Sequence, residues 1–181
     1  ALLAASLLFE LRGTAWGAAP APSLEYDVKA AFLFNFAKFV EWPPETFPDE
    51  RAPLALCIIG DDPFGASLES LVAGEKLDHR PLTVRHTSRP GDLKSCQIAF
   101  IARSEEARMP EILAALRGTS VLSVGESDHF AEQGGIIQFV LEANRVRFAV
   151  NLDALEHTRL KASSKLLRLA RVISGPHGGS P

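Results

Sequence analysis

Histidine is scarce in this chain, and its scattered positions remove the simplest signs of a metal site. The five histidines are His79, His86, His129, His157 and His177. No two of them have the spacing of metal ligands. None lies close to a cysteine or to a serine at a nucleophile elbow. We therefore expect no metal, no cofactor and no catalytic residue, and we interpret the histidines as solvated or internally satisfied side chains.

A glycine-rich phosphate loop is also missing. The stretch Gly60 to Gly65 follows an expected strand, but it has neither the spacing nor the Lys-Ser/Thr pair of such a loop. Asp61 and Asp62 could form the acidic pair of a phospho-receiver domain, yet the strand-end Asp and Lys that this domain needs do not accompany them. An Asp cap with Pro63 at the first helical position explains the residues better. The sequence does not predict an enzyme.

The chain has no excess of positive charge. It carries 19 Lys and Arg against 22 Asp and Glu, for a net charge of -3. There is no general basic field for nucleic acid, and we expect no nucleic-acid partner. A hydrophobic content of 46% and a charged content of 23% are typical of globular proteins. With 181 residues, the chain is long enough for one domain with a real core.

The first residues do not have the pattern of a folded segment. Residues 1–9 form an apolar run, and a small-residue stretch follows up to Pro22. This order is typical of the later part of a secretory signal, with cleavage after Gly17. A disordered linker, or the end of a longer N-terminus, is the alternative. We expect residues 1–22 to be a signal remnant or linker and residues 175–181 to be a disordered tail. An α/β domain should fill residues 23–174.

One long apolar helix is expected over residues 24–42. The stretch has no Gly or Pro, Ser23 can cap it, and Pro43-Pro44 should end it. Only Asn35 and Lys38 are polar between residues 30 and 40, so the helix is apolar nearly all round. It is too short for a bilayer, which needs roughly 20 apolar residues. Such a helix is either buried in a core or covered by a partner.

Strands and helices alternate after this helix. Residues 53–59 and 96–101 are nearly continuous apolar runs, typical of strands buried on both faces, and residues 81–85 and 120–124 are further strands. Helices are expected over residues 64–72 and 104–116, with a short helical segment over 128–132.

The pattern changes in the C-terminal part. Two β-rich runs, residues 136–141 and 146–150, flank a short polar loop and predict a hairpin. A short helix over 152–158 and a final helix over 165–173 should follow. The expected fold is α/β, with a mixed, mainly parallel sheet, helices on both faces and a C-terminal antiparallel hairpin at its edge.

Two polar features invite a functional interpretation. Cys57 and Cys96 lie in or beside core strands, and they could form a disulfide or pack as two buried thiols. Near the C-terminus, hydroxyl groups and cations surround a helix start, which suits a weak anion site or an ordinary cap. The residues of this second feature are Lys161, Ser163, Ser164 and Lys165.

A family resemblance rests on motifs in their order along the chain. Tyr26-x-Val28-Lys29-Ala30-Ala31-Phe32-Leu33-Phe34-Asn35-Phe36 and its continuation to Trp42-Pro43 form the strongest motif. Leu56-Cys57-Ile58-Ile59-Gly60-Asp61-Asp62-Pro63-Phe64-Gly65, Cys96-Gln97-Ile98-Ala99-Phe100-Ile101 and Ser163-Ser164-Lys165-Leu166-Leu167 follow. From about residue 26 to 170, the chain resembles the YfiR family of periplasmic repressors of membrane-bound diguanylate cyclases.

The resemblance implies a function by protein contact. Members are periplasmic, often homodimeric, and bind the sensor region of an inner-membrane diguanylate cyclase; an outer-membrane lipoprotein can draw them away. It also implies a disulfide between Cys57 and Cys96. We expect a non-enzymatic repressor that controls cyclic-di-GMP and biofilm formation. The alternative is a periplasmic domain that senses a small ligand or anion in another signalling system.

The late part of the chain offers a candidate surface for the partner. Leu155, Leu160 and Leu166 lie among cations near the expected hairpin edge. An exposed apolar patch rimmed by charge is how a protein-binding site usually looks. We expect these three leucines to contact the cyclase.

Overall fold

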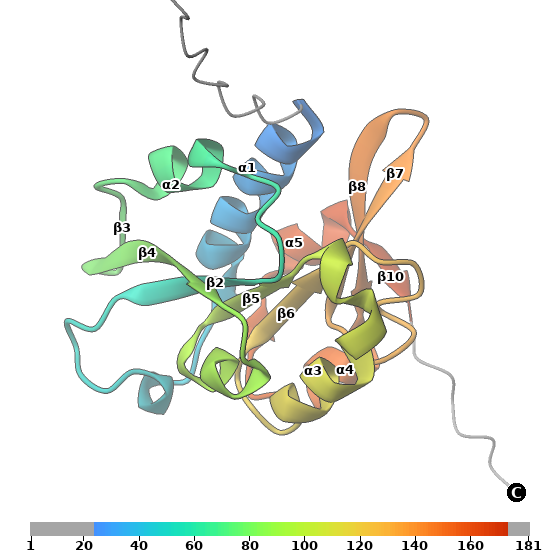
Figure 1. Cartoon of the computed structure of the whole chain (residues 1–181). Coiled ribbons are helices and arrows are strands. Elements are labelled where there is room, and N and C mark those ends of the chain that lie inside the picture. The colour runs from blue at the N-terminus through green and yellow to red at the C-terminus, as the bar shows by residue number, and fades with distance from the viewer. Residues whose placement is uncertain (1–23, 174–181) are drawn as a thin grey trace, which may run out of the picture.

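A mixed sheet of eight strands runs through the part of the chain that the computed structural model describes, residues 24–173 (Figure 1). Its strands are β2 (Leu54–Ile59), β3 (Lys76–Leu77), β4 (Arg80–Thr87), β5 (Ile98–Ile101), β6 (Leu122–Gly125), β7 (Ile137–Glu142), β8 (Arg145–Asn151) and β10 (Arg171–Ile173). The spatial order is β10-β8-β7-β6-β5-β2-β4-β3. Strands β4, β2, β5, β6 and β7 run parallel, and β7 and β8 form the antiparallel hairpin. The predicted fold class is confirmed.

The central strands are buried on both faces, which explains their continuous apolar sequence. All six residues of β2 are buried. Leu54, Leu56 and Ile58 belong to one core, while Cys57 and Ile59 belong to the other. This alternation follows from the two-residue period of a strand. Each face therefore needs its own cover of helices.

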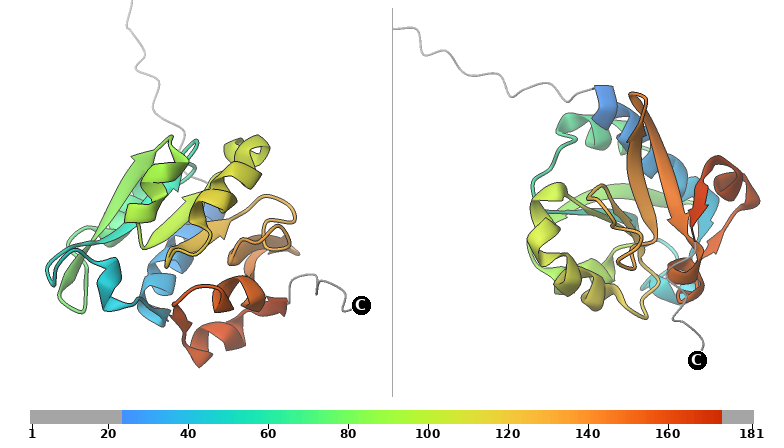
Figure 2. Two further views of the ribbon diagram at one scale, coloured as in Figure 1. Left: turned by 90° about the horizontal axis from the view of Figure 1, so that it is seen from below. Right: turned by 90° about the vertical axis from the view of Figure 1, so that its right-hand side faces the viewer.

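Helices supply that cover on both faces (Figure 2). The helices are α1 (Leu24–Phe39), α2 (Ala66–Val72), α3 (Met109–Leu116), α4 (Leu152–Glu156) and α5 (Ser164–Leu169), with 3-10 segments η1 (Pro44–Thr46), η2 (Pro90–Ser95) and η3 (Arg103–Arg108). Buried residues of α1, α2, α4 and α5 join the first core. Those of α3 and η2 join the second.

Aromatic rings fix α1 on the sheet. Phe32 and Phe36 lie on one helix face, and both rings contact Phe139 of β7 and Phe148 of β8, with centroid separations of 5.1 to 6.1 Å. Phe39 is partly buried against the same core and has the Lys165 ammonium 4.8 Å from its ring centre. Within residues 24–173, no helix is both long enough and apolar enough to cross a bilayer.

The first helix is shorter than predicted. It ends at Phe39, because Val40 and Glu41 form strand β1 (Val40–Glu41), which pairs antiparallel with β9 (Lys161–Ala162). Trp42, expected in the helix, donates from its indole Nε1 to the carbonyl oxygen of Gln97 at 3.0 Å. Pairing with a distant segment therefore ends the helix before Pro43 is reached.

The final helix is also shorter, and the hairpin is not at the edge. Residues 171–173, predicted as helix, form β10, which pairs parallel with β8. Ala170 has an extended backbone that separates α5 from this strand. Strand β10 therefore covers the side of β8 that we expected to be free.

Smaller differences concern helix starts. Helix α2 begins at Ala66, because Asp62 Oδ1 accepts a hydrogen bond from the Phe64 N–H at 2.8 Å and holds a turn before the helix. The predicted helix over 104–116 divides into η3 and α3. The predicted segment over 128–132 is a series of turns. Predictions for residues 1–22 and 175–181, and for Ser23 as a cap, lie outside the described residues.

Candidate functional site

The three leucines predicted to contact a partner are buried in the core, so that prediction is wrong. Leu155, Leu160 and Leu166 expose 8%, 7% and 2% of their surface. All three belong to the same cluster as the buried residues of α1. Because α1 is apolar nearly all round, it needs cover on the side away from the sheet as well, and this C-terminal segment supplies part of it.

The predicted anion site has the geometry of an ordinary helix cap. Ser163 Oγ accepts a hydrogen bond from the Leu166 N–H at 3.2 Å, and the Ser163 N–H donates to the Phe39 carbonyl at 2.8 Å. Lys165 lies over the Phe39 ring, and the exposed Lys161 is in β9, opposite Glu41. Exposed Ser164 is the first residue of α5. These contacts agree with the capping interpretation, and anion binding stays a prediction.

The structure contains the disulfide that the family resemblance implies. Cys57 and Cys96 are bonded, with their Cα atoms 6.0 Å apart. Cys57 lies in β2, and Cys96 lies two residues before β5, the neighbouring strand. Both residues are buried in the second core, beside α3. The bond ties the middle of β2 to the segment that enters β5.

The acidic pair after β2 has a structural role. Asp62 Oδ2 lies 2.9 Å from His86 Nε2, while its other oxygen holds the turn before α2. The Asp61 N–H donates to Ser104 Oγ at 2.9 Å. Among residues 24–173, no group of three or more His, Cys, Asp or Glu side chains could hold a metal ion. The interpretation of this segment as a turn fits these contacts, but the predicted Asp cap with Pro63 at the first helical position is wrong, because α2 begins at Ala66 and Gly65 is its N-cap residue.

A buried ion pair joins α1 to the end of β6, and sequence reasoning missed it. Lys29 Nζ lies 2.6 Å from Glu126 Oε2, and both side chains are almost fully buried. Tyr26 donates its hydroxyl to Glu126 Oε1 at 3.3 Å, and Glu25 pairs with Lys29 from the previous turn. Arg103 donates to the Glu126 carbonyl oxygen at 3.0 Å. The charges are therefore compensated within the fold.

These contacts shift two pKa values upward. Burial alone disfavours the charged Lys29, but its hydrogen bonds and attraction to Glu126 and Glu25 outweigh burial, so its pKa is raised. Burial raises the pKa of Tyr26, and the negative charge of Glu126 raises it further. Both groups therefore keep their protons more strongly in the folded protein.

The most exposed apolar surface lies between the start of α1 and the tip of the hairpin. We call it the α1–hairpin groove. Leu24, Leu141 and Val28 expose 79%, 55% and 37% of their surface there, and Phe32 and Val146 form its floor. The hollow measures about 470 Å³. The groove continues the apolar surface of α1 beyond the part that the sheet covers. The sequence of α1, which is apolar nearly all round, is the one sequence feature that indicates this groove.

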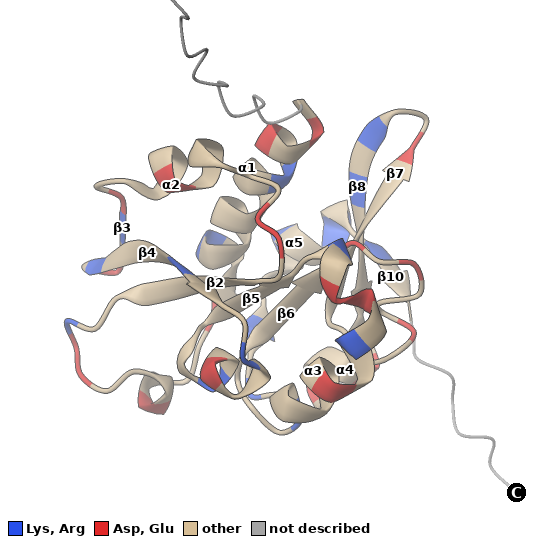
Figure 3. Cartoon of the chain, in the orientation of Figure 1, with Lys and Arg blue, Asp and Glu red and all other residues tan. Residues whose placement is uncertain are grey.

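Charges of both signs surround this groove. Glu25 and Arg145 line it, with Asn144 between the hairpin strands. Figure 3 shows basic positions on β8 and an acidic one at the end of β7. An apolar centre with a mixed charged rim is the usual composition of a surface that binds another protein.

Comparison with known proteins places the fold. The family model described as YfiR/HmsC-like matches residues 26–171. Among solved structures, a conserved domain protein from Vibrio cholerae biovar El Tor is similar, with a TM-score of 0.50 and 11% sequence identity. The alignment covers 81% of this chain and 59% of that protein, so the chain spans less than two thirds of that protein's length. At this identity the likeness concerns the fold alone.

Proposed function

Because the chain belongs to the YfiR/HmsC-like family, we propose that it is a periplasmic regulator that represses an inner-membrane diguanylate cyclase. The match over residues 26–171 is the observation that carries this proposal. The protein binds the sensor region of the cyclase and so limits cyclic-di-GMP and biofilm formation. It acts by contact, without turnover. The buried disulfide suits an oxidising compartment such as the periplasm.

We assign the contact to the α1–hairpin groove, in place of the buried leucines. Leu141 and Val28 are exposed on two different elements and lie on one hollow. An apolar segment of the sensor region would remove these side chains from water, and Arg145 and Glu25 would set its orientation. A homodimer, and release by an outer-membrane lipoprotein, remain parts of the proposal that the family resemblance suggests.

The test begins with deletion of the gene. Loss of the repressor should raise cellular cyclic-di-GMP and biofilm formation, and the wild-type gene should restore both. Complementation with Leu141→Asp should fail to restore repression. A charge buried at an interface without a partner costs roughly 3–5 kcal/mol, more than a hundredfold in affinity.

Leu169→Asp is the matched control. Leu169 is 61% exposed on α5, outside the groove, so this variant should repress like the wild type. Both purified variants should keep the wild-type thermal unfolding curve. Unchanged cyclic-di-GMP after deletion would contradict the repressor function. Full repression by Leu141→Asp, together with a clear effect of deletion, would contradict only the choice of surface.

A further inference from the structure

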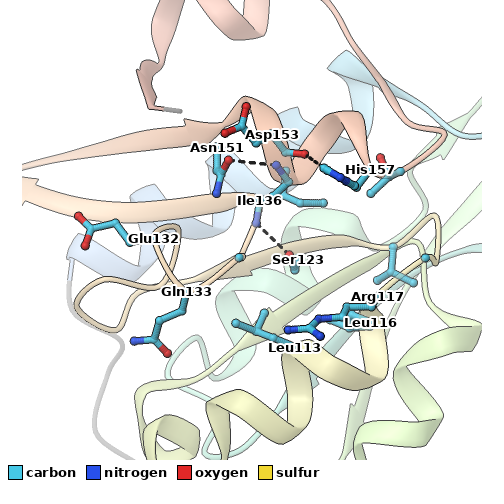
Figure 4. A pocket seen from close by; sticks show the side chains of 15 residues that line it. Leu113, Leu116, Arg117, Ser123, Glu132, Gln133, Ile136, Asn151, Asp153 and His157 are labelled. Carbon is cyan, nitrogen blue, oxygen red and sulfur yellow. Dashed lines mark hydrogen bonds between the residues drawn. The ribbon is translucent and has the colours of Figure 1, made fainter. Parts of the chain in front are cut away.

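A second hollow lies on a different part of the molecule, between the end of α3 and α4 (Figure 4). We call it the α3–α4 cleft. Its volume is about 640 Å³, within the range of small-molecule sites, roughly 300–1,000 Å³. Leu113 and Leu116 of α3, with Val121 and Ile136, give it an apolar floor. All four are buried residues that border the cleft.

Two buried polar side chains also line the cleft, and each keeps a hydrogen to donate. Ser123 Oγ accepts from the Ile136 N–H at 3.0 Å. Asn151 Oδ1 accepts from the Ala154 N–H, while its Nδ2 donates to the Ala131 carbonyl at 2.6 Å. The hydroxyl hydrogen and the second amide hydrogen remain. Among residues 24–173, no hydrogen bond uses either of them.

The cleft is lined by one cation, Arg117, and by two carboxylates, Asp153 and Glu132. Arg117, the residue that ends α3, is exposed and forms no ion pair with any residue in the described range, and Figure 4 shows its side chain lying along α3 near Leu113. The carboxylate of Asp153 turns away from the cleft in the same view. Glu132 is exposed at the opposite side, and its Oε2 lies 2.7 Å from His129 Nδ1. The groups that can serve a ligand oxygen are thus the Arg117 cation and two hydrogen-bond donors, above an apolar floor.

We propose that the α3–α4 cleft binds a small alkyl or aryl monocarboxylate. The carboxylate oxygens accept from Ser123 and Asn151 and face Arg117, while the apolar body contacts Leu113, Leu116 and Ile136. The unused hydrogens of Ser123 and Asn151 are donors, so they fit an oxygen anion and not an ammonium group. This site is separate from the α1–hairpin groove, and the inference does not depend on the cyclase.

Octanoate is the probe, with octan-1-ol and octylammonium as analogues of equal length. Each is titrated into the purified protein and followed by calorimetry and by amide chemical shifts. Octanoate should bind, with the largest shifts at Val121, Ile136 and Ala154, around the cleft. Octylammonium should bind at least about tenfold more weakly, a difference of about 1.4 kcal/mol. Octan-1-ol should fall between them.

Variants separate the cleft from general binding to apolar surface. Arg117→Gln should weaken octanoate binding about tenfold and leave octan-1-ol binding unchanged. Gln133→Trp, an exposed change at the rim, should obstruct the cleft for both. Arg168→Gln removes an exposed cation on α5, outside the cleft, and should have no effect.

Four results would overturn the proposal. They are no octanoate binding up to its solubility limit, equal binding of all three probes, shifts centred on the α1–hairpin groove, and concentration-dependent shifts at the cleft in the absence of probe. The last result would assign the cleft to a second copy of the chain.

Discussion

At the scale of single residues, the pair of Lys29 and Glu126 controls how α1 attaches to the sheet. Both side chains are buried; Lys29 is the one cation paired with Glu126 among the described residues, while Lys29 also pairs with Glu25. A buried pair is often no better than apolar side chains of similar size, yet removing one partner leaves an uncompensated charge in the interior. Replacing one member of the pair should therefore lower the stability of the fold, whereas replacing both by apolar side chains should lower it much less.

We predict that Lys29→Met lowers the free energy of unfolding by about 3–5 kcal/mol, because Glu126 is left buried without its cation. The double variant Lys29→Met with Glu126→Leu should recover most of that loss. Urea denaturation measures both changes. Lys38→Met alters an exposed lysine of the same helix and serves as the control, with little loss expected. A double variant less stable than Lys29→Met alone would contradict the argument.

This pair shows what a sequence can and cannot reveal about a residue. Lys29 is one of few polar residues in an apolar helix, but its partner lies 97 residues away, and no local pattern connects them. Cys57 and Cys96 are also distant, yet the chain has only two cysteines, so only one bridge within the chain is open to them. Two cysteines leave one possible partner for each, whereas 22 acidic side chains leave the ion-pair partner of Lys29 open.

At the scale of elements, the disulfide joins β2 to the segment that enters β5. The bond closes a loop of 39 residues that contains α2, β3, β4 and η2. In the chain-entropy account, such a bond stabilises the fold by restricting the unfolded chain, by about 4 kcal/mol for this length.

We predict that replacing both cysteines by alanine lowers the free energy of unfolding by at most about 4 kcal/mol. The native sheet should persist, because β2 and β5 stay paired by backbone hydrogen bonds. Urea denaturation under oxidising conditions measures the loss. Reduction of the wild type should cause a similar loss, and the reductant should not change the double variant. Equal stability of oxidised and reduced wild type would contradict the prediction.

The elements that could be predicted from the sequence are those with a recognisable pattern in their own residues. The continuous apolar runs of β2 and β5 need two covered faces, and the hairpin has a polar loop between two β-rich runs. The strands that sequence reasoning missed, β1, β3, β9 and β10, have two or three residues each. They exist because a distant or neighbouring strand pairs with each of them, and a pairing partner leaves no mark on the local sequence.

The candidate contact surface was misplaced for a related reason. The cations around Leu155, Leu160 and Leu166 suggested an exposed patch, but on a short helix charged and apolar side chains occupy opposite faces. Lys165 and Arg168 of α5 are exposed, while Leu166 points into the core under α1. Which face is covered depends on the position of α5 against α1, and that is a tertiary contact.

At the scale of the whole molecule, the raised pKa values of Lys29 and Tyr26 predict how stability depends on pH. Each folded pKa lies above its ordinary value, 10.5 for lysine and 10.0 for tyrosine. Above pH 10 the folded protein therefore holds more protons than the unfolded chain. The stabilisation is complete below pH 10 and should be lost as pH rises through the folded pKa values.

Urea denaturation between pH 8 and pH 12 measures this dependence. In Lys29→Met the decrease above pH 10 should be shallower. The chain has one tyrosine, so the near-ultraviolet absorbance of tyrosinate reports Tyr26 directly, and its midpoint should lie above 10.0. A tyrosinate midpoint at or below 10.0 would contradict the assigned burial and the neighbouring negative charge.

The pairing of β1 with β9 has a consequence for the order of folding. Val40, directly after the first helix, pairs with Ala162, close to the end of the described chain. A polypeptide that emerges from a ribosome or a translocation channel with its amino end first therefore presents α1 long before Leu155, Leu160 and Leu166 arrive to cover it. Contacts so distant in sequence close late and slowly. During synthesis or translocation α1 therefore lacks this cover, and the core can be completed only after the C-terminal segment has emerged.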